Sequence, residues 1–138
     1  MSMQALVEFP KVASDAREWR DVCAIDDVLP GTGVAALING DQIAIIRTRD
    51  GRFAALSNYD PFSNAFVIAR GIVGDRAGIP KIASPIYKQN FSLETGECLD
   101  DPTVRLAVYP IRVVSGRVQI STKSRSVSEN MVEASSKG

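Results

Sequence analysis

The chain has 138 residues, of which 45% are hydrophobic and 23% charged, and this composition suits one compact domain. Lys plus Arg and Asp plus Glu number 16 each, so no bulk electrostatic field favours nucleic acid or an anionic membrane surface. The sequence contains no histidine, which excludes imidazole bases, Ser-His-Asp triads and His-ligated zinc within this chain. Carboxylates, lysines and tyrosines remain available for catalysis, but a binding or structural role is favoured.

Two further features point to the cytoplasm. No apolar run approaches the length of a membrane span, and Met1–Lys11, with Glu8 and Pro10, lacks the basic region and apolar core of a signal peptide. Cys23 and Cys98 are the only cysteines, so a disulfide framework is not expected. We therefore expect a cytoplasmic protein without a membrane segment.

Short β-type runs separated by turn signals begin at Trp19 and predict a β-meander. Asn39–Gly40 is the strongest hairpin signal, Asp50–Gly51 marks a second turn, and Asp26–Asp27 predicts a turn or a single helical turn. The expected strands of this half are Trp19–Ile25, Val34–Ile38, Gln42–Arg47 and Arg52–Leu56.

A long segment rich in Gly, Pro and Asn interrupts the strands, and its length marks it as a functional insertion or as small strands of its own. The sequence predicts an N-terminal arm at 1–18, one domain at 19–122 with the inserted subdomain at about 57–91, and a disordered tail at 123–138. The overall pattern favours an all-β sandwich or partial barrel of short antiparallel strands. The strands expected after the insertion are Phe91–Leu93, Val104–Tyr109, Ile111–Val114 and Arg117–Ser121, and the last two are expected to pair across a turn at Ser115–Gly116.

Two motifs inside the insertion carry a resemblance. Asn58-Tyr59-Asp60-Pro61-Phe62 and Ser84-Pro85-Ile86-Tyr87-Lys88-Gln89-Asn90-Phe91, the second followed by Thr95-Gly96, are similar to the two cluster-binding loops of Rieske proteins. Those loops read Asn-x-Cys-Pro-His and Cys-Pro-x-His-Gly-x-x-Phe. The resemblance implies a Rieske-like fold, with the framework kept at Asn58, Pro61, Pro85, Phe91, Thr95 and Gly96.

The four ligand positions do not match. Asp60 and Phe62 stand where the first cysteine and histidine belong, and Ser84 and Tyr87 stand where the second pair belongs. A Rieske centre needs two thiolates and two imidazoles, phenylalanine offers no ligand atom, and hydroxyl oxygens are hard donors poorly matched to a soft site. We therefore expect no iron–sulfur cluster, and no other metal, in this chain.

A framework without ligands resembles one subgroup, the small subunit of assimilatory NAD(P)H-dependent nitrite reductase. The segments that carry this resemblance span about Trp19 to Thr122 and are 58–62, 70–75, 83–89 and 95–98. It implies an accessory subunit, not catalytic by itself, of an oxidoreductase that reduces nitrite to ammonia in nitrate assimilation. It also implies a large subunit as partner, which carries FAD, an iron–sulfur cluster and sirohaem.

The replaced positions can compensate for the cluster. Phe62 can fill the vacated volume, while Asp60, Ser84 and Tyr87 can hydrogen-bond across the gap, so we expect the two loop tips to meet through side chains. A catalytic acid–nucleophile set is less favoured, because no base of suitable pKa is visible. The glycines of 71–78 lack the Lys-Ser/Thr ending of a phosphate loop and predict a hairpin tip.

Mixed charge on the insertion is read either as a solvated surface or as a polar rim for docking onto the large subunit. The candidate partner-contact residues are Tyr59, Phe62, Arg70, Asp75, Arg76, Lys81, Tyr87 and Lys88. Two rival hypotheses remain open. One is an electron carrier with unusual iron ligands, and the other is a free-standing small-ligand or regulatory module that uses the loops as a pocket.

Overall fold

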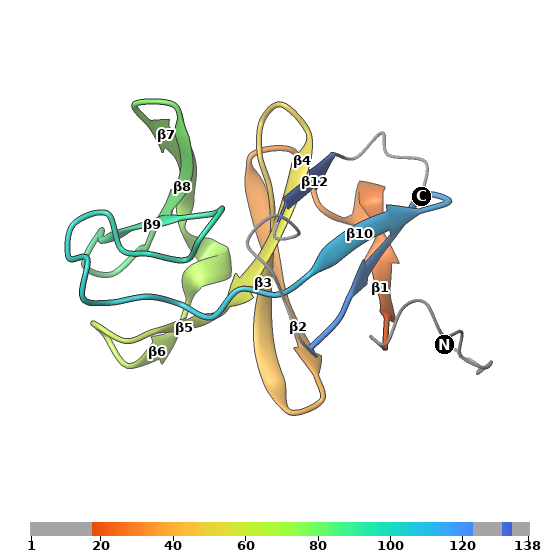
Figure 1. Ribbon diagram of the computed structural model, residues 1–138, viewed down its shortest axis with the longest axis horizontal. Coiled ribbons are helices and arrows are strands. Elements are labelled where there is room, and N and C mark those ends of the chain that lie inside the picture. Colours follow the sequence, from red (N-terminus) through yellow and green to blue (C-terminus); the bar gives the residue numbers. More distant parts are fainter. Residues whose placement is uncertain (1–17, 123–130, 134–138) are drawn as a thin grey trace.

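Short antiparallel strands form nearly all the regular structure of the computed structural model, which describes residues 18–122 and 131–133 (Figure 1). The all-β prediction is therefore confirmed. Two single 3-10 turns accompany the strands. The elements are β1 (Arg20–Ala24), η1 (Ile25–Asp27), β2 (Thr32–Ile38), β3 (Asp41–Arg47), β4 (Arg52–Ser57), β5 (Tyr59–Asp60), β6 (Ala65–Phe66), η2 (Ile68–Arg70), β7 (Ile72–Arg76), β8 (Ile79–Ala83), β9 (Asn90–Ser92), β10 (Ile111–Val114), β11 (Arg117–Ile120) and β12 (Met131–Glu133).

The base of the domain consists of two sheets, ordered β12-β4-β3-β2 and β1-β11-β10. Tight hairpins set the register. Asn39 and Gly40 both have positive φ, 51° and 86°, as a two-residue turn between right-twisted strands requires. Ser115–Gly116 joins β10 to β11 in the same way. The hairpins predicted at both places are confirmed.

The central strand β3 is buried on both faces, and its alternation separates two hydrophobic cores. Ile43 and Ile45 face the core between the two base sheets, whereas Ala44 and Ile46 face a second core under the insertion. Strand β4 follows the same rule, with Phe53 on one side and Leu56 on the other. The insertion thus packs directly against the β3 and β4 strands, whose other face packs in the core of the base.

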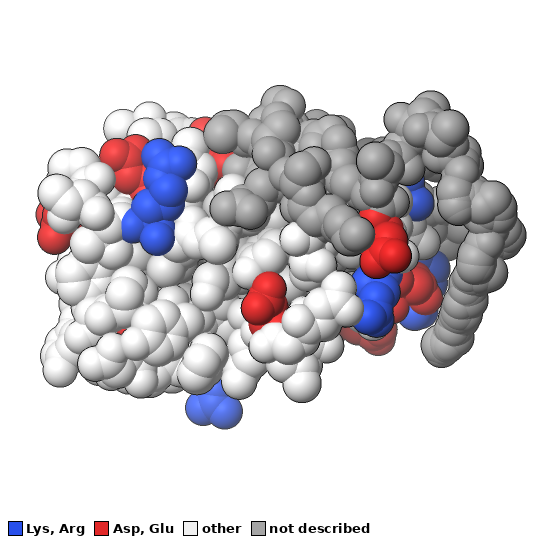
Figure 2. All heavy atoms as spheres, turned by 60° about the horizontal axis from the view of Figure 1, so that its bottom comes forward, with Lys and Arg blue, Asp and Glu red and all other residues white. Residues whose placement is uncertain are grey.

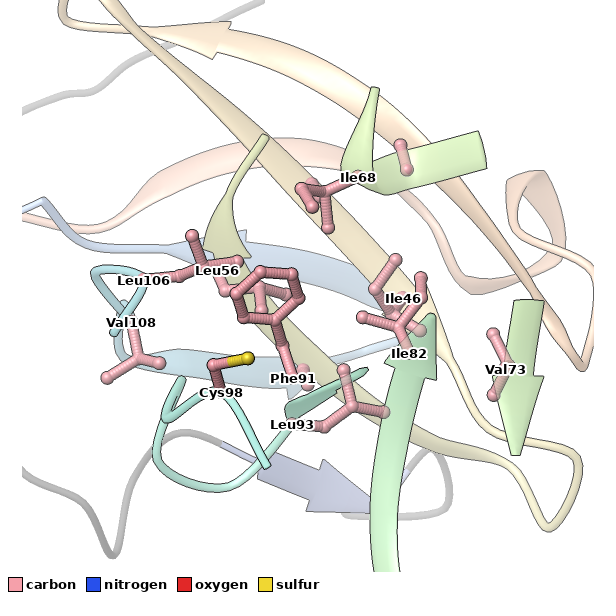
Figure 3. Packing of buried hydrophobic residues seen from close by; sticks show 13 residues of the cluster. Ile46, Leu56, Ile68, Val73, Ile82, Phe91, Leu93, Cys98, Leu106 and Val108 are labelled. Atoms are coloured by element: carbon pink, nitrogen blue, oxygen red, sulfur yellow. The ribbon is translucent and has the colours of Figure 1, made fainter. Parts of the chain in front are cut away.

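The insertion consists of the β5–β6 hairpin, the η2 turn and a sheet of order β7-β8-β9. In Figure 1 it lies on the left, away from β1 and β10. Figure 3 shows its core, where Phe91 of β9 lies among side chains from β3, β4, β8 and the chain after β9. Cys98 is buried in this core at 1% exposure, as expected for a small packing side chain.

Two regions differ from the prediction. Val104–Tyr109 does not form a regular strand, because it crosses from the insertion to the base and pairs at separate points, Arg105 with Glu97 and Val108 with Leu56. The expected disordered tail, 123–138, includes β12, which pairs with β4. The rest of the tail, and residues 1–17 of the expected arm, lie outside the described residues.

The turn after β9 requires glycine at position 96, and this requirement gives a first prediction. Gly96 has a φ of +81°, and a Cβ there would lie 2.1 Å from the Leu106 carbonyl oxygen. Gly96→Ala is therefore expected to lower the free energy of unfolding by about 2–5 kcal/mol, from left-handed strain plus overpacking. Gly116→Ala is the matched control, since its φ is +77° but no atom lies within 4 Å of the added Cβ. Urea denaturation of both variants measures the difference, and equal losses would contradict the packing argument.

Candidate functional site

Two loops of the insertion face each other, and we call Asn58–Asn64 the first loop and Ser84–Asn90 the second loop. The first loop is fixed from below by Asn58, which is buried at 3% exposure. Its Oδ1 accepts a hydrogen bond from Ala69 N at 2.7 Å, and its Nδ2 donates to Gln42 Oε1 at 3.3 Å. This framework asparagine therefore holds the first loop onto both η2 and β3.

Asp60 is the centre of the contact between the loops. Its side chain is fully buried and accepts hydrogen bonds from Phe62 N and Ser63 Oγ, both at 2.9 Å. A third bond comes from Ser84 Oγ of the second loop, which donates to Asp60 Oδ2 at 2.5 Å. Hydrogen bonds to a carboxylate are stronger than neutral ones, so a single side chain ties its own loop and the neighbouring loop together.

The second loop folds back on Ser84. Ser84 N donates to Gln89 O at 2.9 Å, and Lys88 N donates to Ser84 O at 3.0 Å, with Lys88 in the left-handed region at φ 64°. Ser84 itself is fully buried. Backbone hydrogen bonds around the buried Ser84 close this loop. The side chains at the loop tip are not needed for closure and face outward.

The four positions aligned with Rieske ligands thus have different surroundings. Asp60 and Ser84 meet, as expected from the sequence. Phe62 packs inward, with its ring centroid 6.1 Å from that of Phe91, so its apolar surface supports the insertion core. Tyr87 is 62% exposed at the tip of the second loop. The prediction that Tyr87 hydrogen-bonds across the gap is wrong, because the loop turns its side chain toward solvent.

The candidate contact residues are not gathered on one face. Tyr59 lies on the first loop, where its hydroxyl bonds Asn64 Oδ1 and its ring lies 5.2 Å from that of Phe66. Asp75 and Arg76 lie instead at the far tip of the β7–β8 hairpin, since Arg76 pairs with Ile79 and Ile72 with Ala83. Lys81, Arg70 and Lys88 occupy β8, η2 and the second loop respectively.

Sequence reasoning missed four exposed apolar side chains of the insertion: Phe66 at 53%, Ile72 at 59%, Ile86 at 45% and, at the β7–β8 hairpin tip, Ile79 at 37% exposure. The alternation of β7 carried a signal for one of them, because buried Val73 implies that its neighbour Ile72 points outward. Figure 2 shows that the side of the molecule carrying β5 and β6 is a broad surface with little charge. We call Phe66, Ile72, Ile86 and Tyr87 the loop-side apolar patch.

A polar cluster holds the base of the second loop. Asn90 N and Nδ2 donate to Asp100 Oδ2 at 2.8 and 3.0 Å, and Arg76 forms an ion pair with Asp100 at 3.1 Å. Lys81 Nζ donates to Asn90 Oδ1 at 2.6 Å. The hydrogen bonds from Asn90, followed by the one from Arg76, hold the pKa of Asp100 below its ordinary value of 3.8.

This lowered pKa gives a second prediction. A carboxyl whose pKa is lower in the folded than in the unfolded chain stabilises the fold above its unfolded pKa, and this stabilisation is lost as pH falls through the folded pKa. The free energy of unfolding is therefore expected to fall below about pH 4, and Asp100→Asn should reduce that fall. Urea denaturation between pH 2.5 and 7, with Asp26→Asn as control, measures it. An acid dependence identical to that of the parent protein would contradict the role of Asp100.

The residues present do not fit a Rieske-type cluster. Asp60 is engaged by three donors, Phe62 has no ligand atom, and the whole sequence lacks histidine. Cys23 lies on β1, where burial, followed by Asp27, raises the pKa of its thiol to about 11, and Cys98 is enclosed in the insertion core. In the part of the chain that the structure describes, no group of three or more Cys, Asp or Glu side chains could hold a metal ion.

None of the helices in the described residues is long and apolar enough to cross a membrane. The candidate site consists of two loops locked by a buried carboxylate, with apolar side chains and a few cations facing outward. Such a surface can bind another macromolecule.

The small β domain with two facing loops has the architecture of a Rieske-like domain, and comparisons with known proteins agree with this class. Residues 18–121 match the model of the Rieske-like [2Fe-2S] domain family. The nitrite reductase (NADH) small subunit of Salmonella typhimurium is 43% identical over 104 residues, which are 75% of this chain and 96% of that protein. A Mycobacterium tuberculosis crystal structure described as an NADH-dependent nitrite reductase small subunit superposes with a TM-score of 0.76 at 48% identity, covering 80% of this chain and 100% of that one.

The chain thus belongs to the Rieske-like domain family, within its branch of nitrite reductase small subunits. One more relative is informative about context. The nitrite reductase [NAD(P)H] large subunit of Klebsiella oxytoca is 33% identical over 111 residues, which are 80% of this chain but 12% of that protein. In that relative a domain of this kind is part of the large chain itself.

Proposed function

We propose that this chain is an accessory subunit that binds the large subunit of an NAD(P)H-dependent nitrite reductase and supports its reduction of nitrite to ammonia. The observation that carries the proposal is the occurrence of the same domain within the Klebsiella oxytoca large subunit, at 33% identity. A domain that is covalently attached in one protein and separate in another works beside the same partner in both cases, because a linker only raises the local concentration.

The redox groups belong to the partner in this proposal. FAD, an iron–sulfur cluster and sirohaem are assigned to the large subunit, and this chain, with Asp60, Phe62, Ser84 and Tyr87 in place of ligands, takes no electron itself. The complex is assigned to the cytoplasm, where reduced nicotinamide cofactors are available. The ligand set speaks against the rival hypothesis of an electron carrier.

We assign the contact with the large subunit to the two loops and the loop-side apolar patch. Tyr87 and Ile86 at the tip of the second loop supply an exposed aromatic and aliphatic pair, the kind of residue that dominates binding energy when it enters a partner's pocket. Lys88 belongs to the second loop and Arg70 ends η2, and in this proposal these two exposed cations supply the polar rim. Asp75 and Arg76, at the far hairpin tip, are proposed as peripheral contacts at most.

A reconstitution experiment tests the function. The purified large subunit is assayed for NAD(P)H-dependent nitrite reduction with increasing amounts of this chain, and the mixture is analysed by size-exclusion chromatography. We expect co-elution and a saturable change in nitrite turnover at a defined stoichiometry. If the chain neither co-elutes with the large subunit nor changes its turnover, the proposal is wrong.

A further inference from the structure

The two edges of the four-stranded base sheet differ in how their backbone groups are paired. On β4, the outward backbone groups of Phe53, Ala55 and Ser57 all have partners. Phe53 pairs with Val132 of β12, Tyr109 N donates to Ala55 O at 3.0 Å, and Ser57 N donates to Ala107 O at 2.8 Å. Strand β12 lies beyond residues 18–121, which match the domain family, so this chain completes one edge of its sheet with an additional segment.

The opposite edge is β2. The two-residue hairpin closes on the pair Ile38 and Asp41, whose backbone N–H and C=O groups point toward each other. Because this direction alternates along a strand, the backbone groups of Val34 and Ala36 also point toward β3. Those of Ala35 and Leu37 therefore point away from the sheet. Among residues 18–122 and 131–133, no strand pairs with this side of β2.

Strand β2 also lacks the features that normally protect an exposed edge. Its sequence, TGVAALI, has no charge and no proline, and its seven pairs with β3 run without a register shift. Leu37 is 73% exposed, and Ala35 is exposed as well. By contrast, the edge strand β1 carries Arg20 and Asp21 and has a bulge between Asp21 and Cys23. A long, regular, uncharged edge is a template for adding another strand.

We propose that the β2 edge binds the β2 edge of a second copy of this chain, in an antiparallel pair whose two-fold axis passes beside Ala35. The strand is self-complementary in this register. The outward-pointing residues pair with one another, Ala35 with Ala35 and Leu37 with Gly33 of the second copy, as antiparallel hydrogen bonding requires. The pairing joins two four-stranded sheets into one.

The side chains favour the same register. The exposed Leu37 lies across from Gly33 of the second copy, and the two alanines at the axis allow close approach. A Cβ on Gly33 would lie 2.8 Å from Ala69 O of η2, so Leu37 is placed next to η2 of the second copy. Strand β2 itself brings no charge to the seam. This association uses a different surface from the two loops and does not depend on the proposed function.

Charge substitutions at the axis test the pairing. Ala35→Lys and Ala35→Glu each place like charges directly opposite, which destabilises an antiparallel pair, whereas a mixture of the two variants places opposite charges there. Sedimentation velocity of the full chain over about 10 μM to 1 mM, a range set by the modest strength of edge pairing, is expected to show dimers for the parent protein. It should show monomers for each variant alone and dimers again for the mixture. Leu29→Lys, which changes an exposed leucine outside β2, is the control and should dimerise like the parent.

Three results would overturn the proposal. The parent protein could remain monomeric over the whole concentration range, or Ala35→Lys could dimerise as well as the parent. Alternatively, dimers could be lost only on deletion of 123–138, which would assign them to the tail. Thermal unfolding of each variant checks the fold, which should be unchanged because Ala35 is exposed.

Discussion

Replacing Asp60 with alanine is expected to lower the free energy of unfolding by about 2–4 kcal/mol. The variant removes the acceptor for Phe62 N, Ser63 Oγ and Ser84 Oγ, and Ser84 is fully buried. Donors left without partners in a dry site cost their full desolvation free energy. Urea denaturation followed by circular dichroism measures the loss.

Three companion variants make this result specific. Asp60→Asn keeps the shape and one acceptor oxygen, so its loss should be smaller than that of alanine. Ser84→Ala removes one donor together with its bond, and about 1 kcal/mol is expected. Asp26→Ala, at an exposed carboxylate in η1, should change stability by less than about 0.5 kcal/mol. An Asp60→Ala loss no larger than that of Asp26→Ala would show that the carboxylate does not hold the loops together.

Replacing Tyr87 with aspartate is expected to weaken binding to the nitrite reductase large subunit by about 10- to 100-fold, the range of a strong contact residue. Tyr87 is 62% exposed and lies at the tip of the second loop, so the change removes apolar contact area and places a negative charge beside the cations of the rim. The stability of the free chain should be unchanged, because the side chain is not part of the core. Isothermal titration calorimetry with the purified large subunit measures the affinity.

Leu29→Asp is the matched control for this prediction. Leu29 is 66% exposed, close to the value for Tyr87, but it precedes β2 at the base of the domain. It should bind the large subunit with the affinity of the parent protein. Equal affinities for the parent protein and Tyr87→Asp would show that the second loop is not part of the interface.

The hairpins and most strand boundaries of the base could be predicted because the relevant signals are local. Asn39–Gly40, Ser115–Gly116 and the glycine-rich 71–78 segment each predict a hairpin from two or three residues, and each hairpin is present. Val104–Tyr109 could not be predicted in the same way. Its alternating apolar residues are buried as in a strand, but its backbone partners come from different parts of the chain, and alternation reports burial rather than pairing.

The candidate site was predicted in part for a similar reason. The Asp60–Ser84 contact follows from the position of two loops that face each other in the fold, so a motif comparison could anticipate it. The outward turn of Tyr87 follows from the left-handed backbone at Lys88 and the closure of the loop on Ser84, and residue types alone do not specify either feature. The pairing of β12 with β4 was also missed, because a three-residue strand depends on the edge that it covers rather than on its own sequence.

Hydrogen–deuterium exchange of this chain, alone and with the large subunit, tests the central claim most directly. The claim is that the loops without cluster ligands form the contact surface of an accessory subunit. We expect slower exchange on binding in both loops, at Tyr59–Asn64 and Ser84–Lys88, and unchanged exchange in β1, β10 and β11. Unchanged exchange at both loops, with protection appearing elsewhere on the domain, would contradict the account.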